Sequence, residues 1–306
     1  MPNQKSVTVY ANKYRLNDIE QGTFRFFNKM KSAFESIGYN VATKEDSNEN
    51  ILLSSSDPGY SLILEGEPLN SKSLCFRRAY TEPFWQIEKS AKRWEFEVAS
   101  LPFLPDDTNS QPARYFTRYW RKKLFGHADL LRETPKHILC PLQGQLLRQR
   151  SFQSMSPLEM LEELAAHESS RPILATLHPS ENYSQEEISA LNIVMYRHKN
   201  ISVSRADTKT LISSSSYIAT MNSTVSFWGM FWGVPSVLFG RVDFHHLHPN
   251  TFDNSVIEAI KLQDSVDTSL YEKYIYWFWK QQSIRSWSDD AEKSILNVVN
   301  RRGWRL

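Results

Sequence analysis

Between residues 137 and 240, short apolar segments that favour strands alternate with segments that favour helices. The regular alternation predicts a parallel β-sheet with helices on both faces, because parallel strands must be joined by crossover connections. The predicted strands are residues 137–142, 172–179, 201–204, 216–222 and 235–240, and the predicted helices are residues 156–168, 184–199, 208–215 and 223–233.

The rest of the chain carries a less regular pattern of the same kind. Strands are predicted at 7–11, 40–44 and 73–80, with apolar segments 50–55 and 60–66 on either side of a turn at 57–59; helices are predicted at 23–37, 83–99, 111–126, 255–263, 269–283 and 289–304. We predict an α/β fold with two α/β domains, residues 1–132 and 133–264. Residues 265–306 would form C-terminal helices that cross back to the first domain.

Glycine is scarce, with 10 residues in 306, and its positions exclude two common phosphate-binding loops. No two glycines are separated by a single residue, so the chain contains no G-x-G-x-x-G motif. No glycine precedes a lysine, so it contains no Walker A loop. A nucleotide would therefore have to be held by other groups.

Composition narrows the class of protein further. The 36 basic and 34 acidic residues leave a net charge of +2, which gives no global attraction for nucleic acid. The two cysteines, Cys75 and Cys140, lie in apolar segments and are predicted to be core residues in a reducing compartment. The chain starts without an apolar leader and has no apolar stretch long enough to span a membrane, so we expect a cytoplasmic protein.

Polar residues follow three of the predicted strands in the second half. Gln143 follows the first strand, His178 and Pro179 end the second, and Asn222-Ser223-Thr224 begins the helix after the fourth. Ligands of parallel sheets bind at the carboxyl ends of strands, so these residues should share one edge. A helix start and a histidine can both hold a phosphate. The alternatives are an ordinary helix cap and a structural turn histidine.

The three histidines at 245, 246 and 248 follow the last predicted strand. They have one nearby carboxylate, at Asp243, and no nearby cysteine to complete a metal site. We therefore predict that this loop packs against the cleft and that the protein uses neither a metal nor a cofactor.

A basic and aromatic segment in the first half is a second candidate site. Arg77 and Arg78 could hold a sugar carboxylate in a bidentate way, and the ring of Trp85 could lie against a sugar. The alternative is an aromatic helix that packs in the core, with its arginines in solvent.

Three segments resemble the C-terminal half of the bacterial capsule-polysaccharide biosynthesis family, which includes retaining β-Kdo transferases that use CMP-Kdo. These segments are HILCPLQ, ILATLHPSENYS and YIATMNSTVSFWGMFWGVPSVLFG, and the resemblance covers roughly residues 137–242. It implies a GT-B-like pair of Rossmann-like domains. It also implies that His178 contacts the CMP phosphate, that residues 222–224 cradle the nucleotide, and that Gln143 matches a family glutamine.

The sequence departs from this family at two places. The family has a lysine near the His-Pro pair, where Thr176 and Leu177 stand here. The Kdo transferases also carry an Asp soon after the matched glutamine, whereas the run QGQLLRQRSFQ contains no acid. Either Glu181 or Glu82 takes the catalytic role, or the chemistry differs, or activity is lost. Arg148 and Arg150 in that run could bind an acidic sugar or a phosphate.

The sequence thus predicts a glycosyltransferase of capsular or lipopolysaccharide-type polysaccharide biosynthesis. The donor would be a CMP-linked sugar such as Kdo, bound by the second domain, and the acceptor a glycan or glycolipid, bound by the first. The alternatives are a transferase for another nucleotide sugar and a non-catalytic nucleotide- or glycan-binding protein. Basic aromatic segments at 114–123 and 274–280 suggest peripheral contact with the inner membrane, although domain packing would also account for them.

Overall fold

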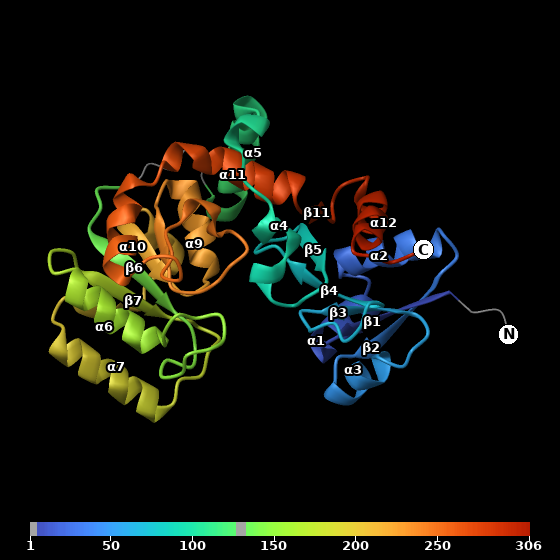
Figure 1. Ribbon diagram of the computed structural model, residues 1–306, viewed down its shortest axis with the longest axis horizontal. Helices are drawn as coiled ribbons and strands as arrows, with labels where there is room; N and C mark the ends of the chain where they lie inside the picture. The colour runs from blue at the N-terminus through green and yellow to red at the C-terminus, as the bar shows by residue number, and fades with distance from the viewer. Residues whose placement is uncertain (1–4, 127–132) are drawn as a thin grey trace. The chain divides into compact units, whose positions relative to one another are not determined.

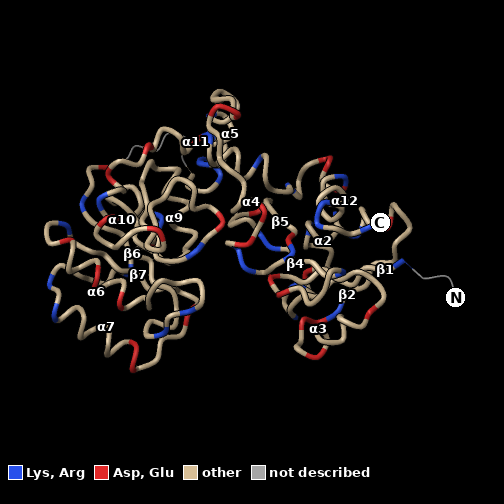
Figure 2. The backbone as a smooth tube through the Cα atoms, viewed as in Figure 1, with Lys and Arg blue, Asp and Glu red and all other residues tan. Residues whose placement is uncertain are grey.

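The computed structural model of the protein describes residues 5–126 and 133–306 (Figure 1). Its internal contacts divide the chain into two compact units. The first unit comprises Met1–Leu101 together with Phe278–Leu306, and the second comprises Pro102–Trp277. The domain boundary that we predicted at residue 132 lies outside the described residues. Basic and acidic residues are interspersed along most of the chain (Figure 2).

The second unit is built on a five-stranded, all-parallel sheet with the strand order β10-β9-β6-β7-β8. The strands are β6 (His137–Leu142), β7 (Ile173–Leu177), β8 (Ile201–Ser204), β9 (Ser215–Thr220) and β10 (Ser236–Leu238). The chain starts at the central strand, adds two strands on one side and then two on the other. This confirms the predicted alternation, and it places a reversal of strand order between β6 and β9.

Helices cover both faces of this sheet, as predicted. They are α6 (Pro157–His167), α7 (Gln185–Arg197), α8 (Thr208–Ile212), α9 (Thr224–Gly229) and α10 (Val256–Leu262); α5 (Ser110–Phe125) and α11 (Tyr271–Tyr276) pack against each other. Ser156 and Ser184 each cap a helix in a reciprocal arrangement with the Glu three residues later. These helix starts could therefore be predicted from local sequence.

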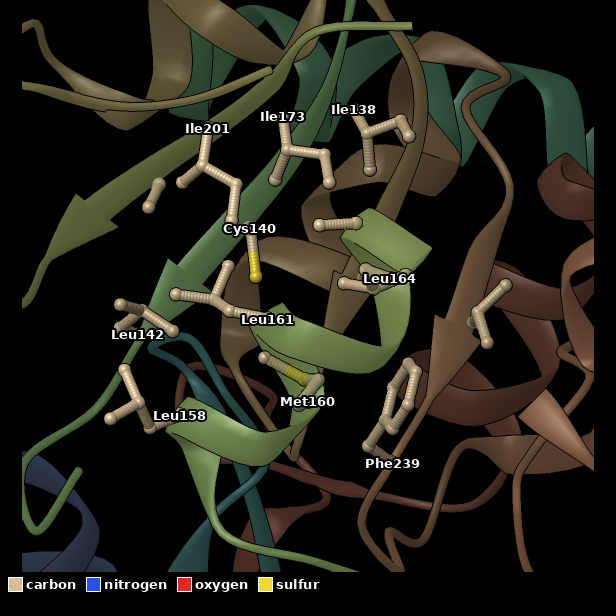
Figure 3. Close-up of a cluster of buried hydrophobic side chains, with 14 of the residues drawn as sticks. Ile138, Cys140, Leu142, Leu158, Met160, Leu161, Leu164, Ile173, Ile201 and Phe239 are labelled. Atoms are coloured by element: carbon tan, nitrogen blue, oxygen red, sulfur yellow. The ribbon is translucent and has the colours of Figure 1, made fainter. Parts of the chain in front are cut away.

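The core of the second unit follows the alternation of side chains along β6. Cys140 and Leu142 face α6, whereas the neighbouring Leu139 belongs to the opposite cluster with Ile218 and Val225. Figure 3 shows Leu161 of α6 pointing toward Cys140. Because both faces are covered, all six residues of β6 are buried.

The first unit contains a mixed six-stranded sheet with the order β11-β5-β4-β3-β1-β2. Its strands are β1 (Ser6–Ala11), β2 (Asn40–Glu45), β3 (Tyr60–Leu64), β4 (Ser73–Arg78), β5 (Phe84–Glu88) and β11 (Ile284–Arg285); its helices are α1 (Lys13–Glu20), α2 (Arg25–Glu35), α3 (Asn48–Ser54), α4 (Glu97–Ser100) and α12 (Ala291–Arg301). Strands β1 to β4 are parallel, and β5 and β11 are antiparallel to their neighbours. Side chains of α2 and α12 pack together in one cluster on the sheet.

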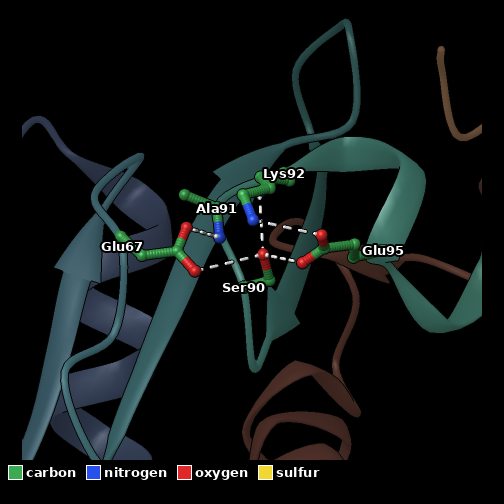
Figure 4. Close-up of polar contacts among 5 residues, drawn as sticks. All are labelled: Glu67, Ser90, Ala91, Lys92 and Glu95. Carbon is green, nitrogen blue, oxygen red and sulfur yellow. Dashed lines mark hydrogen bonds and ion pairs between the residues drawn. The ribbon is translucent and has the colours of Figure 1, made fainter. Parts of the chain in front are cut away.

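The predicted helix over residues 83–99 is wrong. Its first part is β5, and a short 3₁₀ turn and α4 follow. All five residues of β5 are buried, so the segment lacks the alternation of polar and apolar residues that identifies a half-buried strand. After β5 the chain turns through a polar cluster, in which Ser90 Oγ lies between the carboxylates of Glu67 and Glu95 (Figure 4).

The division by contacts also differs from the domain boundaries that we predicted at residues 132 and 264. Helix α5 lies in the second unit because it packs on α11, and the return to the first unit begins at Phe278. Trp279 anchors that return, since its ring stacks on Phe84 and its indole N–H donates to the carbonyl of Ala79 at 2.9 Å. Within residues 5–126 and 133–306, no helix combines the length and apolar character needed to cross a bilayer.

A buried ion pair ties the C-terminal helix end to β5. Arg302 Nη2 lies 2.7 Å from Glu88 Oε1, and the two side chains are 9% and 6% exposed. Arg302 Nη1 lies 2.9 Å from Glu97 Oε2, and Nε donates to the carbonyl of Ile87. Burial raises the pKa of Glu88 to about 7 although the guanidinium opposes this shift.

We predict that Arg302→Leu lowers the free energy of unfolding by about 3 kcal/mol at pH 8, because it strands the Glu88 carboxylate in the core. The loss should be smaller at pH 5, where the raised pKa leaves Glu88 neutral in the folded protein. Urea unfolding at the two pH values measures both effects. Arg301→Leu is the matched control, since Arg301 is 61% exposed and 3.7 Å from Glu97, and should cost less than about 1 kcal/mol. Equal losses for the two variants would refute the prediction.

Candidate functional site

The residues predicted to bind the nucleotide follow β6, β7 and β9, which are neighbours in the parallel sheet. Leu139 pairs with Ile218, so Gln143 and Asn222 follow the carboxyl ends of two paired strands. The hydroxyl of Thr220 supports this register by donating to the carbonyl of Pro141 at 3.3 Å. The order of strands reverses between β6 and β9, and open α/β sheets bind ligands at such a point.

The loop after β6 is packed against the loop after β7. Gly144 is buried there, and a Cβ atom at this position would collide with the carboxylate of Glu181. Arg150 Nη2 donates to Gln143 Oε1 at 3.3 Å. The structure therefore brings together three predicted site residues, Gln143, Arg150 and Glu181, that come from two different loops.

Arg150 is the partly buried cation of this group. Its guanidinium lies 4.8 Å from the centre of the Phe152 ring and interacts electrostatically with Glu181. Desolvation lowers the pKa of Arg150, although Glu181 acts in the opposite direction. Arg148 is exposed, and its backbone N–H donates to the Gln145 carbonyl within the loop. A half-buried guanidinium beside one carboxylate can still bind an anion, because it has five donors.

His178 has a defined orientation in the turn after β7. Its Nδ1 accepts a hydrogen bond from the backbone N–H of Ser180 at 3.2 Å. In the neutral ring the proton therefore resides on Nε2, which makes Nε2 a donor. Both His178 and Pro179 are exposed, so a ligand can reach this donor.

Two residues that sequence reasoning missed hold these loops in place. The Tyr183 hydroxyl accepts from the backbone N–H of His178 at 2.9 Å and donates to the carbonyl of Leu142 at 3.5 Å. Glu187 accepts from the backbone N–H of Leu146 at 2.6 Å while it caps α7. The capping box marks Glu187 in the sequence, but its bond to a loop 41 residues away has no local signal.

The Asn222-Ser223-Thr224 segment begins a helix as predicted. Ser223 is the N-cap, and its side chain accepts from the Val225 N–H at 3.2 Å. Asn222 Oδ1 is buried without a hydrogen-bond partner. Helix α9 has only six residues and continues as a 3₁₀ turn, so its dipole is smaller than the predicted helix over residues 223–233 implied. The buried Oδ1 atom of Asn222, rather than the dipole, is the feature of this segment that points to a ligand.

Gly240 explains how the end of β10 fits against this segment. A Cβ atom at Gly240 would lie 2.7 Å from the Met221 carbonyl oxygen, so any larger residue would displace the backbone that precedes Asn222. The glycine that follows β10 thus allows a close backbone approach at the site rather than forming a phosphate loop.

The candidate residues of the first unit have mainly structural partners. Trp85 is 1% exposed and stacks on Phe26 with ring centres 4.7 Å apart, so the predicted sugar-stacking role is wrong. Glu82 accepts a hydrogen bond from the Trp85 indole at 3.0 Å. Arg77 donates to the carbonyl of Ala91 at 3.2 Å, and Arg78 is exposed. The ring is buried because β5 lies inside the sheet, whereas our assignment placed it on a helix.

The three histidines after β10 do not share a metal site. The described residues contain no group of three or more His, Cys, Asp and Glu side chains placed to hold a metal ion. His245 contacts the carbonyl of Val242, and His246 contacts the Tyr274 hydroxyl at 2.8 Å. His248 is 5% exposed, and neither ring nitrogen has a hydrogen-bond partner. These residues pack the loop against α11, within the second unit.

Comparison with known proteins supports the fold. No known family model matches the chain. No curated protein matches it either. Among solved structures, Thermosulfurimonas dismutans KpsC, beta Kdo 2,7 transferase, aligns over 97% of this chain and 99% of that chain, with a TM-score of 0.53 and 13% identity. The beta Kdo 2,4 transferase of the same KpsC aligns over 79% and 81%, with a TM-score of 0.44 and 14% identity.

The wall teichoic acid polymerase TagF aligns over 97% of this chain and 88% of its own, with a TM-score of 0.34 and 11% identity. The match to the beta Kdo 2,7 transferase of KpsC confirms the predicted fold class. The chain has a GT-B-like α/β fold with two Rossmann-like units.

We predict that His248 makes the second unit sensitive to acid. Burial, reinforced by His245 and His246, lowers the pKa of His248 to about 3, whereas the unfolded chain protonates this ring near pH 6.5. Below pH 6.5 the unfolded state therefore binds a proton that the folded state excludes. The free energy of unfolding should fall by about 1.4 kcal/mol per pH unit from this residue alone.

The variant His248→Phe should lose less stability than the native protein between pH 6.5 and pH 4.5. The ring would keep its contacts with Phe244 and Tyr271 without a site for the proton. Urea unfolding across this pH range measures the difference. Parallel pH curves for the two proteins would show that His248 does not carry the effect.

Proposed function

We propose that this protein is a glycosyltransferase of surface-polysaccharide biosynthesis that binds a nucleotide sugar at the carboxyl edge of the second unit's sheet. The observation that carries the proposal is the oriented His178, whose Nε2–H donor is exposed in the turn after β7. The adjoining loops add the Arg150 guanidinium and the Gln143 amide. Together these groups suit the phosphate and polar edges of a nucleotide.

The buried Oδ1 atom of Asn222 supports the same proposal. A buried acceptor without a donor costs free energy, and a ligand with an N–H or O–H group would recover it. A cytosine amino group and a sugar hydroxyl both provide such a donor. We infer that Asn222 contacts the nucleotide, with Ser223 and Thr224 beside it at the start of α9.

For the donor, we propose a CMP-linked acidic sugar such as Kdo. The resemblance of residues 137–242 to CMP-Kdo-dependent transferases supports this choice, and the fold shared with KpsC agrees with it. Arg148 and Arg150 would meet the negative charge of the sugar or phosphate. A transferase for another nucleotide sugar would use the same edge, so the choice of base must be tested directly.

In the proposed reaction, the bond between the anomeric carbon and the phosphate oxygen breaks and CMP leaves with the electron pair. His178 and Arg150 would stabilise the departing phosphate, because donors aimed at developing charge lower the barrier. A carboxylate of the protein bonds to the anomeric carbon as CMP leaves. The acceptor hydroxyl oxygen then attacks this carbon, the bond to the carboxylate breaks and returns its electron pair to the carboxylate, and the hydroxyl proton passes to solvent. In this scheme protein groups supply the positive charge, and no metal or cofactor takes part.

Glu181 is our candidate for the carboxylate that attacks the anomeric carbon. It is exposed, lies against Gly144, and faces the same loop as Arg150. Glu82, the other acid that the sequence suggested, accepts the Trp85 indole hydrogen bond, which gives it a structural role instead. The acceptor would be a glycan or glycolipid, for which the first unit is the proposed binding domain, and the reaction would take place in the cytoplasm at the inner membrane.

We predict that CMP binds the protein and changes its tryptophan fluorescence, and that His178→Ala weakens binding at least about tenfold. A hydrogen bond to a charged phosphate is worth about 1.5–3 kcal/mol, which sets this magnitude. His198→Ala is the matched control, because His198 caps the far end of α7 and should leave affinity unchanged.

A parallel titration with UDP identifies the nucleotide. Tighter binding of CMP supports the CMP-sugar donor, and tighter binding of UDP supports the alternative transferase. If neither nucleotide binds, or if His178→Ala and His198→Ala behave alike, the proposed site is refuted.

We predict that Glu181→Gln lowers the release of CMP from CMP-Kdo at least about a thousandfold without changing affinity for CMP, because it removes the nucleophile but not the phosphate contacts. Glu186→Gln, which neutralises an exposed acid in the first turn of α7, is the control and should retain activity. Unchanged turnover by Glu181→Gln would remove Glu181 from the mechanism. Native protein that binds CMP but never turns over its sugar would favour the non-catalytic alternative.

A further inference from the structure

Helix α5 presents a cationic and aromatic face to solvent. Ala113, Thr117 and Trp120 are its buried residues, and they follow one another at helical spacing on a single side. The Thr117 hydroxyl donates to the carbonyl of Glu272 at 3.2 Å, which fixes this side against α11. The opposite side of α5 is therefore the side that faces solvent.

Two tyrosines lie on the exposed side, one helical turn apart. Tyr115 is 66% exposed and Tyr119 is 54% exposed. A tyrosine ring is amphipathic and is enriched at the boundary between lipid and water. Two such rings at positions i and i+4 form a short stripe along the helix.

Basic side chains flank this stripe. The exposed cations of α5 are Arg114, Arg118, Lys122 and Lys123. The helix contains no acidic residue between Ser110 and Phe125. The nearest acids before it in the sequence, Asp106 and Asp107, precede its first turn. A chain with a net charge of only +2 thus concentrates positive charge on one helix face.

We propose that the exposed face of α5 binds the surface of a bilayer that contains anionic phospholipids. Lys and Arg near such a surface are attracted to the headgroups, and interfacial tyrosines add contact with the acyl boundary. Nucleic acid is a less suitable partner, because the tyrosines form a stripe at helical spacing with cations beside it, the arrangement of an interfacial helix. This inference rests on the proposed function only in that a glycolipid acceptor would place the enzyme at a membrane.

The second basic aromatic segment that we predicted for membrane contact does not contribute. Within residues 274–280, the rings of Tyr274, Phe278 and Trp279 are fully buried and Trp277 is 7% exposed. Tyr274 and Trp277 contact each other and the ring of His246. This segment packs in the core, which leaves α5 as the proposed surface.

Co-sedimentation with two vesicle types tests the proposal. One type is pure phosphatidylcholine, and the other is an equimolar mixture of phosphatidylcholine and phosphatidylglycerol. We expect the native protein to bind the mixed vesicles at low salt, to bind the neutral vesicles far less, and to be released as salt screens the charges.

Two variants and one matched control assign the binding to α5. Arg114→Gln with Lys122→Gln should lower the partition coefficient on the mixed vesicles about 25-fold, at about fivefold per cation. Tyr115→Ser with Tyr119→Ser should lower it severalfold at all salt concentrations. Arg205→Gln with Lys261→Gln removes the same charge from exposed positions of the same unit and should leave it unchanged.

Four results would overturn the proposal: no binding to the mixed vesicles, equal binding to the neutral ones, equal losses in the Arg114/Lys122 variant and the control, or tighter binding of an RNA homopolymer through the same residues. Circular dichroism checks that each variant is folded. CMP titration of each variant separates this proposal from the proposed function, because nucleotide binding should not depend on α5. Native protein that binds CMP but not the mixed vesicles would refute the proposed surface and leave the donor site standing. Native protein that binds the mixed vesicles but not CMP would refute the donor site and leave the surface standing.

Discussion

The candidate site depends on the position of β6, a strand that is buried along its whole length at the centre of a parallel sheet. Strands β7 and β9 pair with β6 along its two opposite edges. The chain therefore continues from β7 and from β9 toward opposite ends of the strand order. The order of strands reverses between β6 and β9, and ligands of open α/β sheets bind at such a point. For this reason Gln143 and Asn222, although distant in sequence, follow the ends of adjacent strands.

Side-chain bonds between the loops make this edge a defined arrangement. Tyr183 joins the turn of His178 to the end of β6, and Glu187 joins α7 to the backbone of Leu146. Gly144 lets the carboxylate of Glu181 lie directly against the first loop. These contacts fix the positions of the loops that carry His178 and Glu181, and both side chains remain exposed. The result is a set of donors and acceptors held close together on rigid strand ends, which is what binding a small charged ligand requires.

Local sequence was sufficient to predict the helix ends that are fixed by contacts between residues close together in the chain. Ser156 and Ser184 correctly predicted the starts of their helices, because a capping box involves only residues within one turn. Gly126 ended α5 in the left-handed conformation that glycine adopts without strain. The same reasoning failed for β5, since a strand buried on both faces has the composition of a buried helix. Trp85 was misplaced with it, and its ring packs on Phe26 in the core.

The sequence by itself determined the order of strands and helices in the second unit and the edge at which polar residues gather, because both follow from patterns repeated along the chain. Only the tertiary structure decided which of these side chains are exposed and which are held by other groups. The Nδ1 bond that orients His178 arises within its turn, but the bond from Tyr183 to Leu142 and the burial of Asn222 Oδ1 depend on neighbouring strands. Whether an aromatic ring is exposed, as Tyr115 is, or buried, as Trp279 is, likewise depends on packing with segments distant in sequence. Contacts of that kind leave no periodic signal, and for that reason they had to be seen in the fold.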